Sequence, residues 1–327
     1  MSKKPLIKKK FKFTMLGLLI ASIISFLISF TILYSSDYKL SNYVSYFEEM
    51  GYSLNDFLTN GEFSLNGFKY NKTGTFDLLK EDVDTINFNS GNYDIHVYPS
   101  GDYSLKTYFS AKGFSANQNP LDDTKWNFKY DKKDKTLNIS LDVKIDNNFN
   151  TDHSNYNIDF YIPTKYKNKI KINSTSGNIN IASNSENNLD LSSDSGRISV
   201  DSIKNLKATT KTGDIDLDGQ IKNFDISTDS GNIRNTSSDY NFGKIKSKSG
   251  DVNSSIYAKN SLDIKTESGN ISIDTYGDND PYSISAETKS GNISNSNEDI
   301  INSPYKINKG KVKLNINSHS GNITFNQ

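Results

Sequence analysis

One short phrase organises this chain: a serine or threonine, then glycine, a polar residue and isoleucine or valine. It occurs eight times between residues 176 and 323, with a single earlier copy at Ser90-Gly91-Asn92. The repeated glycines are Gly177, Gly196, Gly213, Gly231, Gly250, Gly269, Gly291 and Gly321. They step by 19, 17, 18, 19, 19, 22 and 30 residues. A period near 19 that persists over so many steps indicates a repeat architecture, in which each unit stacks on its neighbours.

Each copy of the phrase lies between two stretches in which apolar and polar residues alternate, as in residues 262–273. Such alternation predicts β-strands. Ile264 and Ile271 are seven positions apart, so on one straight strand they would face opposite sides. Both can be buried only if the chain bends at Ser-Gly. Glycine allows the positive φ or the crowded backbone that a corner needs, so we predict that the eight glycines are structural turn residues.

The pattern predicts an all-β fold, a single-stack β-solenoid over residues 75–327, with regular repeats over residues 157–327. A coil supplies about four inward aliphatic side chains, such as Leu262, Ile264 and Ile273, each worth about 1.5–3 kcal/mol when buried. That is less than the backbone entropy of about 19 residues at about 1–2 kcal/mol each. One coil alone is therefore not expected to fold, and stability requires stacking.

The N-terminal region predicts a membrane anchor. Residues 1–12 contain six lysines and no acid, and residues 13–34 contain no charge. Twenty-two uncharged residues are long enough to cross a bilayer, and the basic tail predicts a cytoplasmic N-terminus with an extracellular C-terminal domain. A cleaved signal peptide is the alternative. The apolar stretch is longer than signal peptides have and lacks their small-residue ending, which favours an uncleaved single-pass anchor.

Residues 35–74 are expected to form an extracytoplasmic helical stalk or linker. Within them, residues 38–59 carry apolar side chains at helical spacing. They could cap the β domain, lie on the membrane or contact a membrane partner. Because they lack a lysine-rich polar face, we favour the stalk or cap.

Three local features extend this prediction. Residues 126–130 and 137–143 are expected to pair across the polar turn between them. The long final step holds an insertion near residues 297–310, which we expect to be a loop on one face of the stack. Phe325, two residues from the end, is a candidate plug for the end of the solenoid.

The composition narrows the function. The chain has no cysteine and equal numbers of acidic and basic residues, 38 of each, so thiolate metal sites and nucleic-acid binding have little support. His96, His153 and His319 are far apart and have no metal-ligand spacing. The Asn and Asp that follow the glycines could form a calcium ladder, but the calcium-binding nonapeptide is absent, which favours a structural role. We expect no cofactor, metal or catalytic set.

Aspartates 214, 216 and 218 share one strand face by their spacing. They could serve sugar chemistry, as in β-helix polysaccharide enzymes, or form a solvated acidic face, which we favour.

The array of [ST]-G-[ND]-[IV] turns, with the strand of residues 158–162 ending in Pro163 before the first of them, resembles the bacterial "putative adhesin" β-repeat family. With a basic tail and one anchor ahead of it, the layout is similar to LiaG-type envelope-stress proteins of low-GC Gram-positive bacteria. The resemblance implies an extracytoplasmic β-solenoid of the cell envelope and carries over no catalytic residue. Arg197 departs from the family's Asn or Asp.

Taken together, the sequence predicts a non-catalytic, membrane-anchored binding or scaffold module in envelope adhesion or the envelope-stress response. Its partner could be a cell-wall polymer or an envelope protein, and it is not expected to bind nucleic acid. The alternatives are a carbohydrate-active β-helix enzyme and an accessory subunit of a membrane complex.

Overall fold

The structure is a computed structural model in which the C-terminal β domain is described. The described residues are 70–111, 126–143, 156–182, 185–237, 240–255, 257–274, 282–295, 300–308 and 310–326, with the helical residues 20, 22, 24 and 25. The chain divides into two units, residues 1–68 with 114–118, and residues 69–113 with 119–327. The predicted stalk, apart from residues 70–74, lies outside the described residues, as does most of the predicted anchor. Among the described residues, no helix has the length and apolar character needed to cross a membrane.

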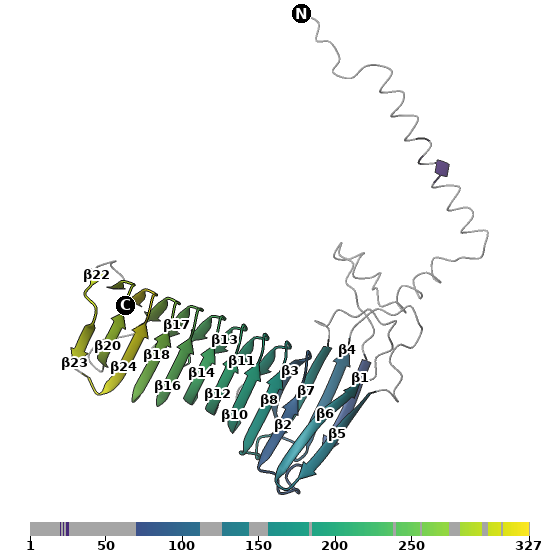
Figure 1. The fold of residues 1–327 in the computed structure, drawn as a ribbon. Coiled ribbons are helices and arrows are strands. Elements are labelled where there is room, and N and C mark those ends of the chain that lie inside the picture. Colours follow the sequence, from purple (N-terminus) through teal and green to yellow (C-terminus); the bar gives the residue numbers. More distant parts are fainter. Residues whose placement is uncertain are drawn as a thin grey trace, which may run out of the picture. The chain divides into compact units, whose positions relative to one another are not determined.

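The β domain consists of two sheets stacked face to face along one long axis (Figure 1). The first sheet contains, in spatial order, β1 (Tyr70–Phe76), β4 (Leu105–Ala111), β7 (Tyr156–Pro163), β3 (Asp94–Ser100), β9 (Ile179–Ile181), β11 (Ile198–Val200), β13 (Ile215–Leu217), β15 (Ile233–Asn235), β17 (Val252–Ser255), β19 (Ile271–Asp274), β25 (Ile323–Asn326), β21 (Ile293–Asn295) and β22 (Ile300–Ile301).

The second sheet contains, in spatial order, β23 (Tyr305–Asn308), β20 (Tyr282–Thr288), β24 (Val312–Ser318), β18 (Ser261–Thr266), β16 (Phe242–Ser247), β14 (Ile221–Thr228), β12 (Ile203–Thr210), β10 (Ser185–Ser193), β8 (Lys169–Ser174), β2 (Thr85–Asn89), β6 (Thr136–Val143) and β5 (Trp126–Lys133).

Each regular coil runs along a long strand of the second sheet, turns at Ser-Gly, and continues as a short strand of the first sheet. Neighbouring coils are in parallel register, so that Ile264 lies beside Ile245 and Ile271 lies beside Val252. Ile264 and Ile271 are both buried between the sheets, as the expected corner requires. The prediction of an all-β stack of parallel repeats is therefore confirmed for the described β domain.

The last coil does not lie at the end of the stack. Strand β24 is inserted between β18 and β20, and β25 between β19 and β21. Phe325 is thus paired between Ile273 and Asn295 and is buried inside the stack. Our expectation that Phe325 plugs the end was wrong, because the coil of residues 282–295 stacks outside it.

The insertion in the final step also differs from expectation. It contributes strands β22 and β23, which pair antiparallel with β21 and β20 at the end of the two sheets. It is therefore a cap on the last coil rather than a loop on one face. The other end is closed in the same way, since β1 pairs antiparallel with β4, and β5 with β6. All four outermost strands are thus antiparallel additions, which cover the open edges of the parallel stack.

The N-terminal end shows a second insertion. Strands β2 and β3 lie between the coil of β6 and β7 and the coil of β8 and β9. The pairing predicted between residues 126–130 and 137–143 is confirmed by the register of β5 and β6. Strand β1 begins at Tyr70 and spans the expected boundary at residue 75.

Candidate binding groove

The repeated glycines are required by close stacking of the backbone at the corner. A β-carbon added to Gly196 would lie 2.1 Å from the carbonyl oxygen of Gly177, and one added to Gly250 would lie 1.7 Å from that of Gly231. All eight predicted turn glycines show such a contact with a backbone carbonyl of the neighbouring coil. Among the described glycines only Gly91 and Gly219 have positive φ. At the repeated corners, glycine is therefore required by backbone crowding and not by a positive φ.

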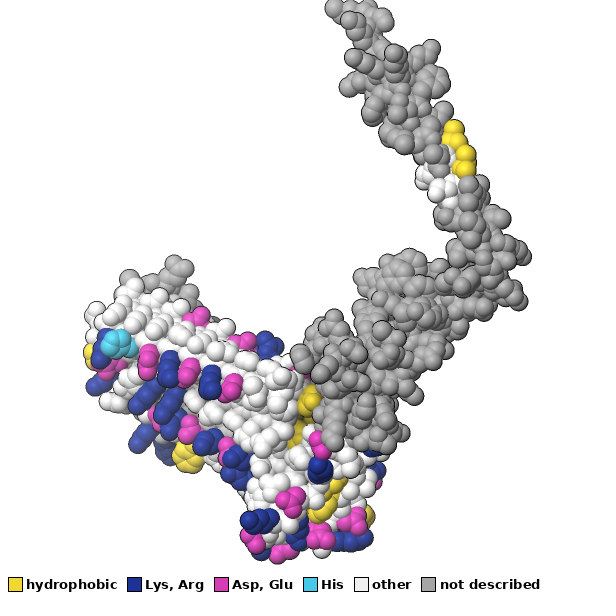
Figure 2. Space-filling model, turned by 45° about the vertical axis from the view of Figure 1, so that its right-hand side comes forward, with side chains coloured by type: hydrophobic (Ala, Val, Ile, Leu, Met, Phe, Trp, Pro, Cys, Tyr) yellow, Lys and Arg dark blue, Asp and Glu magenta, His cyan; other side chains and the backbone are white. Residues whose placement is uncertain are grey.

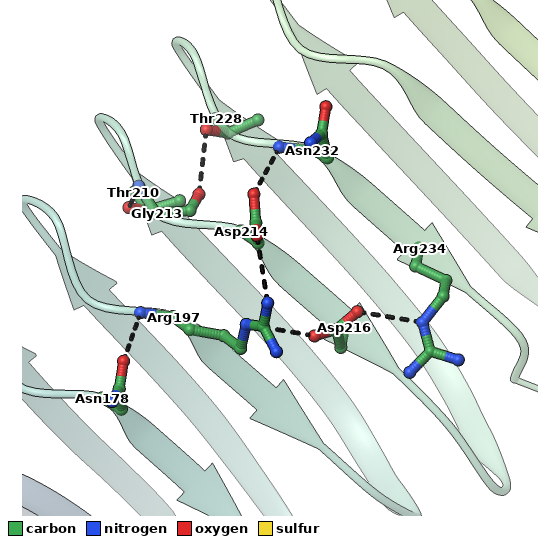
Figure 3. Close-up of polar contacts among 9 residues, drawn as sticks. All are labelled: Asn178, Arg197, Thr210, Gly213, Asp214, Asp216, Thr228, Asn232 and Arg234. Atoms are coloured by element: carbon green, nitrogen blue, oxygen red, sulfur yellow. Dashed lines mark hydrogen bonds and ion pairs between the residues drawn. The ribbon is translucent and has the colours of Figure 1, made fainter. Parts of the chain in front are cut away.

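The residue after each glycine forms a ladder along the stack. The side-chain oxygen of Asn178 accepts the backbone N–H of Arg197 at 2.9 Å, and that of Asp214 accepts the N–H of Asn232 at 2.8 Å (Figure 3). The same bond joins Asn232 to Asp251 at 3.0 Å. Asn and Asp are interchangeable here because each offers an acceptor oxygen at the same place. The structural reading of this column is confirmed.

A second column, three residues before the glycine, was missed by the sequence reasoning. Its hydroxyls are buried, and six of the eight accept the glycine N–H, as Thr228 does from Gly231 at 2.9 Å. Thr228 also donates to the carbonyl oxygen of Gly213 in the preceding coil at 3.3 Å. The signal was present as Ser or Thr at the same place in all eight copies, namely Ser174, Ser193, Thr210, Thr228, Ser247, Thr266, Thr288 and Ser318.

Arg197 interrupts the ladder, because a guanidinium group has no acceptor atom for the N–H of the next coil. Its side chain instead contacts two carboxylates, Nη2 lying 3.2 Å from Asp214 and Nε lying 3.6 Å from Asp216. Arg234 contacts Asp216 from the other side, with Nε 3.1 Å from Oδ1 (Figure 3). Both arginines are more than half exposed, whereas the Asp216 side chain is 18% exposed.

These two residues are the only arginines of the chain, which otherwise uses lysine for every basic position. Arginine differs from lysine in its planar, forked donors, which suit bidentate recognition. Their joint position around Asp216 marks this part of the first sheet as chemically distinct from the rest of the repeat.

A groove of about 300 Å³ lies on the outer face of the first sheet beside this cluster. It crosses strands β3, β9, β11, β13 and β15, which are adjacent in the sheet. Its lining residues are His96, Tyr98, Asn180, Ile181, Ala182, Ser199, Val200, Asp201, Asp216, Asp218 and Arg234.

Tyr98 lies at the β3 end of the groove. On one side its ring stacks on Tyr161 with centroids 5.2 Å apart. The neighbouring coil on the other side provides only Ala182 at this level, since the N–H of Ala182 bonds to the carbonyl of Val97. Burial, then Asp159 and Tyr161, raise the pKa of Tyr98, so its hydroxyl stays neutral and can donate. His96 is held by a 3.0 Å contact from Nδ1 to Asp159.

The acidic groups of the groove are also held in place. Oδ1 of Asp218 accepts from the N–H of Gly219 at 2.8 Å and the hydroxyl of Thr236 at 3.3 Å. Oδ1 of Asp201 accepts from Ser202 at 2.9 Å. Asp216 and Asp218 both point outward, as their spacing predicted, but Asp216 is bound by both arginines rather than freely solvated.

The opposite sheet and the corner edge carry exposed rows of alternating charge (Figure 2). Two residues before each glycine, successive coils present Asp194, Lys211, Asp229, Lys248 and Glu267. Lys211 contacts Asp194 and Lys248 contacts Asp229, each at 2.7 Å. These pairs are exposed and contribute little stability.

A wider depression of about 580 Å³ lies at the C-terminal end of these rows. Its lining contains Lys246, Lys248, Lys265 and Lys289 together with Asp229, Glu267 and Glu287. Because its positive and negative charges nearly balance, this depression shows no preference for an anionic or a cationic ligand.

The other candidates from the sequence show no converging set. His96 and His319 lie in different coils, and His153 lies outside the described residues. Within the part of the chain that the structure describes, no group of three or more His, Asp or Glu could hold a metal ion.

The chain is similar to solved structures described as a "putative adhesin" from Parabacteroides distasonis (12% identity, TM-score 0.43, covering 80% of this chain and 98% of that one) and from Bacteroides fragilis (17%, 0.37, 80% and 98%). It is also similar to a protein described as lipid-binding from Parabacteroides distasonis (17%, 0.35, 79% and 98%). These TM-scores are below 0.5, so the properties in those names are not transferred to this chain.

No curated protein matches the chain. A family model does match, over residues 83–326, which is most of the chain and the whole repeat array. The family predicted from the iterated corner residues is confirmed: the chain belongs to the Toastrack DUF4097 family.

Proposed function

We propose that this protein is a non-catalytic binding module of the cell envelope, held at the membrane by residues 13–34 and displaying its β domain outside the cell. The main support is the way the domain uses its polar residues. The repeated Ser, Thr, Asn and Asp side chains are engaged in hydrogen bonds between coils, as Thr228 and Asp214 illustrate. What remains for recognition is the outer faces, where side chains form rows and grooves of the kind that bind extended partners.

The membrane topology can be tested because the chain contains no cysteine. Phe242→Cys places a thiol at a side chain that is 55% exposed, and Ser2→Cys places one in the basic tail. A membrane-impermeant maleimide added to intact cells is expected to label the first variant and to label the second only after lysis. Labelling of Ser2→Cys on intact cells, or none of Phe242→Cys, would contradict the proposed topology.

Binding is tested by crosslinking on intact cells followed by purification of the full chain. A defined envelope polymer or protein is expected to co-purify. Deleting residues 38–59 distinguishes this proposal from the accessory-subunit alternative. A membrane partner bound by that segment would no longer co-purify with the protein from a detergent extract. A partner bound by the β domain would be retained.

The enzyme alternative came from Asp214, Asp216 and Asp218, of which Asp216 and Asp218 line the groove together with Asp201. Asp216 is bound by two guanidinium groups, which favours a positioning role over proton transfer. The purified chain is therefore expected to leave glycans intact. Cleavage that is abolished by Asp218→Asn would refute the non-catalytic proposal.

A further inference from the structure

The groove between Tyr98 and Arg234 has features that the scaffold does not explain. Arg197 occupies a corner position where Asn or Asp would add a bond to the ladder, so this position gives up a structural hydrogen bond. Asp201 and Asp218 lie side by side in neighbouring coils, since the N–H of Asp218 bonds to the carbonyl of Val200. Like charges at such positions are unfavourable. Departures from local rules that gather at one place are typical of functional sites.

The donors and acceptors of the groove are arranged for hydroxyl groups. Arg234 uses Nε for Asp216, and among the contacts of the described residues its two terminal nitrogens have no other partner. Asp201 and Asp218 each use Oδ1 within the protein, as described above, which leaves Oδ2 of each outside those contacts. Such a carboxylate oxygen can accept from one sugar hydroxyl, while the N–H groups of the forked guanidinium donate to the oxygen of a neighbouring hydroxyl.

Tyr98 supplies the apolar part of such a site. Its ring stacks on Tyr161 and lies 6.1 Å from the ring of His96, its neighbour on the same strand. Tyr98, His96 and Ala182 all line the groove. The floor is formed by small side chains, Ala182 and Ser199, over the buried Ile181 and Val200. A flat ring beside this floor, with carboxylates and a guanidinium along the groove, matches a molecule with an apolar face and a rim of hydroxyls.

The length and charge of the groove narrow the ligand further. It crosses four strand spacings of about 4.8 Å, or roughly 19 Å, which is the length of a short oligosaccharide. Three carboxylates line it against the single guanidinium of Arg234. This acidic surplus disfavours uronic acids, phosphate polymers and other anions.

We propose that the groove bounded by Tyr98 and Arg234 binds a neutral glycan, with a sugar ring on Tyr98 and hydroxyls on Arg234, Asp201 and Asp218. This assignment rests on the proposed function, since it names the ligand class of the same binding module.

The test uses the full chain in a detergent without a sugar headgroup. Tetramers of glucose, mannose and N-acetylglucosamine serve as neutral probes, and polygalacturonate serves as the anionic probe. At least one neutral tetramer is expected to bind more tightly than polygalacturonate. Tyr98→Ala and Arg234→Lys are expected to weaken that binding about tenfold, which corresponds to the loss of one aromatic or bidentate contact.

Two further variants separate the ring from its surroundings. Tyr98→Phe keeps the ring and is expected to retain most of the affinity. Tyr103→Ala removes a tyrosine that is 67% exposed and does not line the groove, so it is expected to leave the affinity unchanged. Far-UV circular dichroism melts confirm that each variant is folded.

The proposal is overturned if none of the neutral tetramers binds, if polygalacturonate binds more tightly, or if Tyr98→Ala and Arg234→Lys leave the affinity unchanged. Sedimentation of the same protein with isolated cell envelopes distinguishes the two levels of the account. Envelope binding that survives Tyr98→Ala refutes the glycan groove and keeps the binding module. Tetramer binding without envelope binding supports the glycan groove and refutes the proposal that the protein is a binding module of the envelope.

Discussion

A β-carbon on Gly231 would lie 1.9 Å from the carbonyl oxygen of Gly213 in the neighbouring coil. The obstacle is backbone, which cannot rotate away as a side chain could. Gly231→Ala is therefore expected to push two coils apart and to destabilise the domain by about 1–3 kcal/mol, the usual range for overpacking. Urea unfolding of the full chain measures this.

Gly101→Ala is the matched control for that change. Gly101 has no atom within 4 Å of an added β-carbon and no positive φ. Its replacement is expected to leave the unfolding midpoint unchanged. Equal effects of Gly101→Ala and Gly231→Ala would show that crowding at the corner is not the reason for glycine.

The buried hydroxyl of Thr228 gives a second prediction. Thr228→Val keeps the shape but removes the acceptor of the Gly231 N–H and the donor to the Gly213 carbonyl. Leaving these buried groups unpaired costs about 1–3 kcal/mol, so the melting temperature is expected to fall. Thr228→Ser keeps the hydroxyl, as Ser247 does at the equivalent position, and is expected to have the smaller effect. A Val variant as stable as the Ser variant would be inconsistent with this role.

The ladder after the glycine predicts which substitutions are tolerated. Oδ1 of Asn270 accepts the N–H of Asn322 at 3.0 Å. Asn270→Asp keeps this acceptor and is expected to be tolerated, whereas Asn270→Ala loses it at a cost of about 0.5–1.5 kcal/mol. Chemical unfolding compares the two. The ladder account fails if both variants are equally stable.

Arg197→Asn supplies the acceptor that is missing from the ladder. The added bond to the N–H of Asp214 is expected to offset the lost ion pairs, which are exposed and weak. The melting temperature is therefore expected to stay the same or rise. A clear fall would show that Arg197 serves the stability of the stack.

The buried tyrosines predict a loss of stability at alkaline pH. Burial raises the pKa of the Tyr240 phenol far above its usual 10.0, and its hydroxyl donates to the carbonyl of Ser255. Because the folded state keeps a proton that the unfolded chain releases above that value, stability is full below pH 10.0 and falls as pH rises further. Urea midpoints between about pH 8 and about pH 11 measure the fall. Tyr240→Phe should make it less steep, and an unaltered pH profile would exclude this contribution.

The corner and the strand pattern could be predicted because each depends on a short local stretch of sequence. Ile264 and Ile271 differ in parity, and only a bend at Ser-Gly buries both. The stacking order could not be predicted, since the coils present equivalent inward residues. Either Ile316 of β24 or Ala286 of β20 could lie beside Ile264, because both are small or aliphatic inward residues at the same place in the repeat. The period alone therefore does not show that β24 lies between β18 and β20.

The binding groove was hidden for a related reason. Tyr98 reaches the groove because β3 is inserted between β7 and β9, two strands that are far from it in the sequence. The arginine cluster left a signal, since Arg197 and Arg234 are the only arginines and stand one and three residues after their glycines. With coils in register, those offsets place Arg234 beside Asp216 and Arg197 beside Asp214, from where the Arg197 side chain also reaches Asp216. A single count of 38 for lysine and arginine together does not show that only two of these residues are arginines, so the cluster was not predicted.

Removal of residues 232–269 from the full chain tests the central claim that the repeat is a stacking scaffold. The deletion joins Gly231 to Asn270 and takes out two whole coils, β15 to β18, which leaves Ile226 to pair beside Ile316 and Ile215 beside Ile271. The shortened protein is expected to keep its β-sheet circular dichroism and to unfold in one transition at a lower temperature. An unfolded chain, or an unchanged melting temperature, would contradict the account.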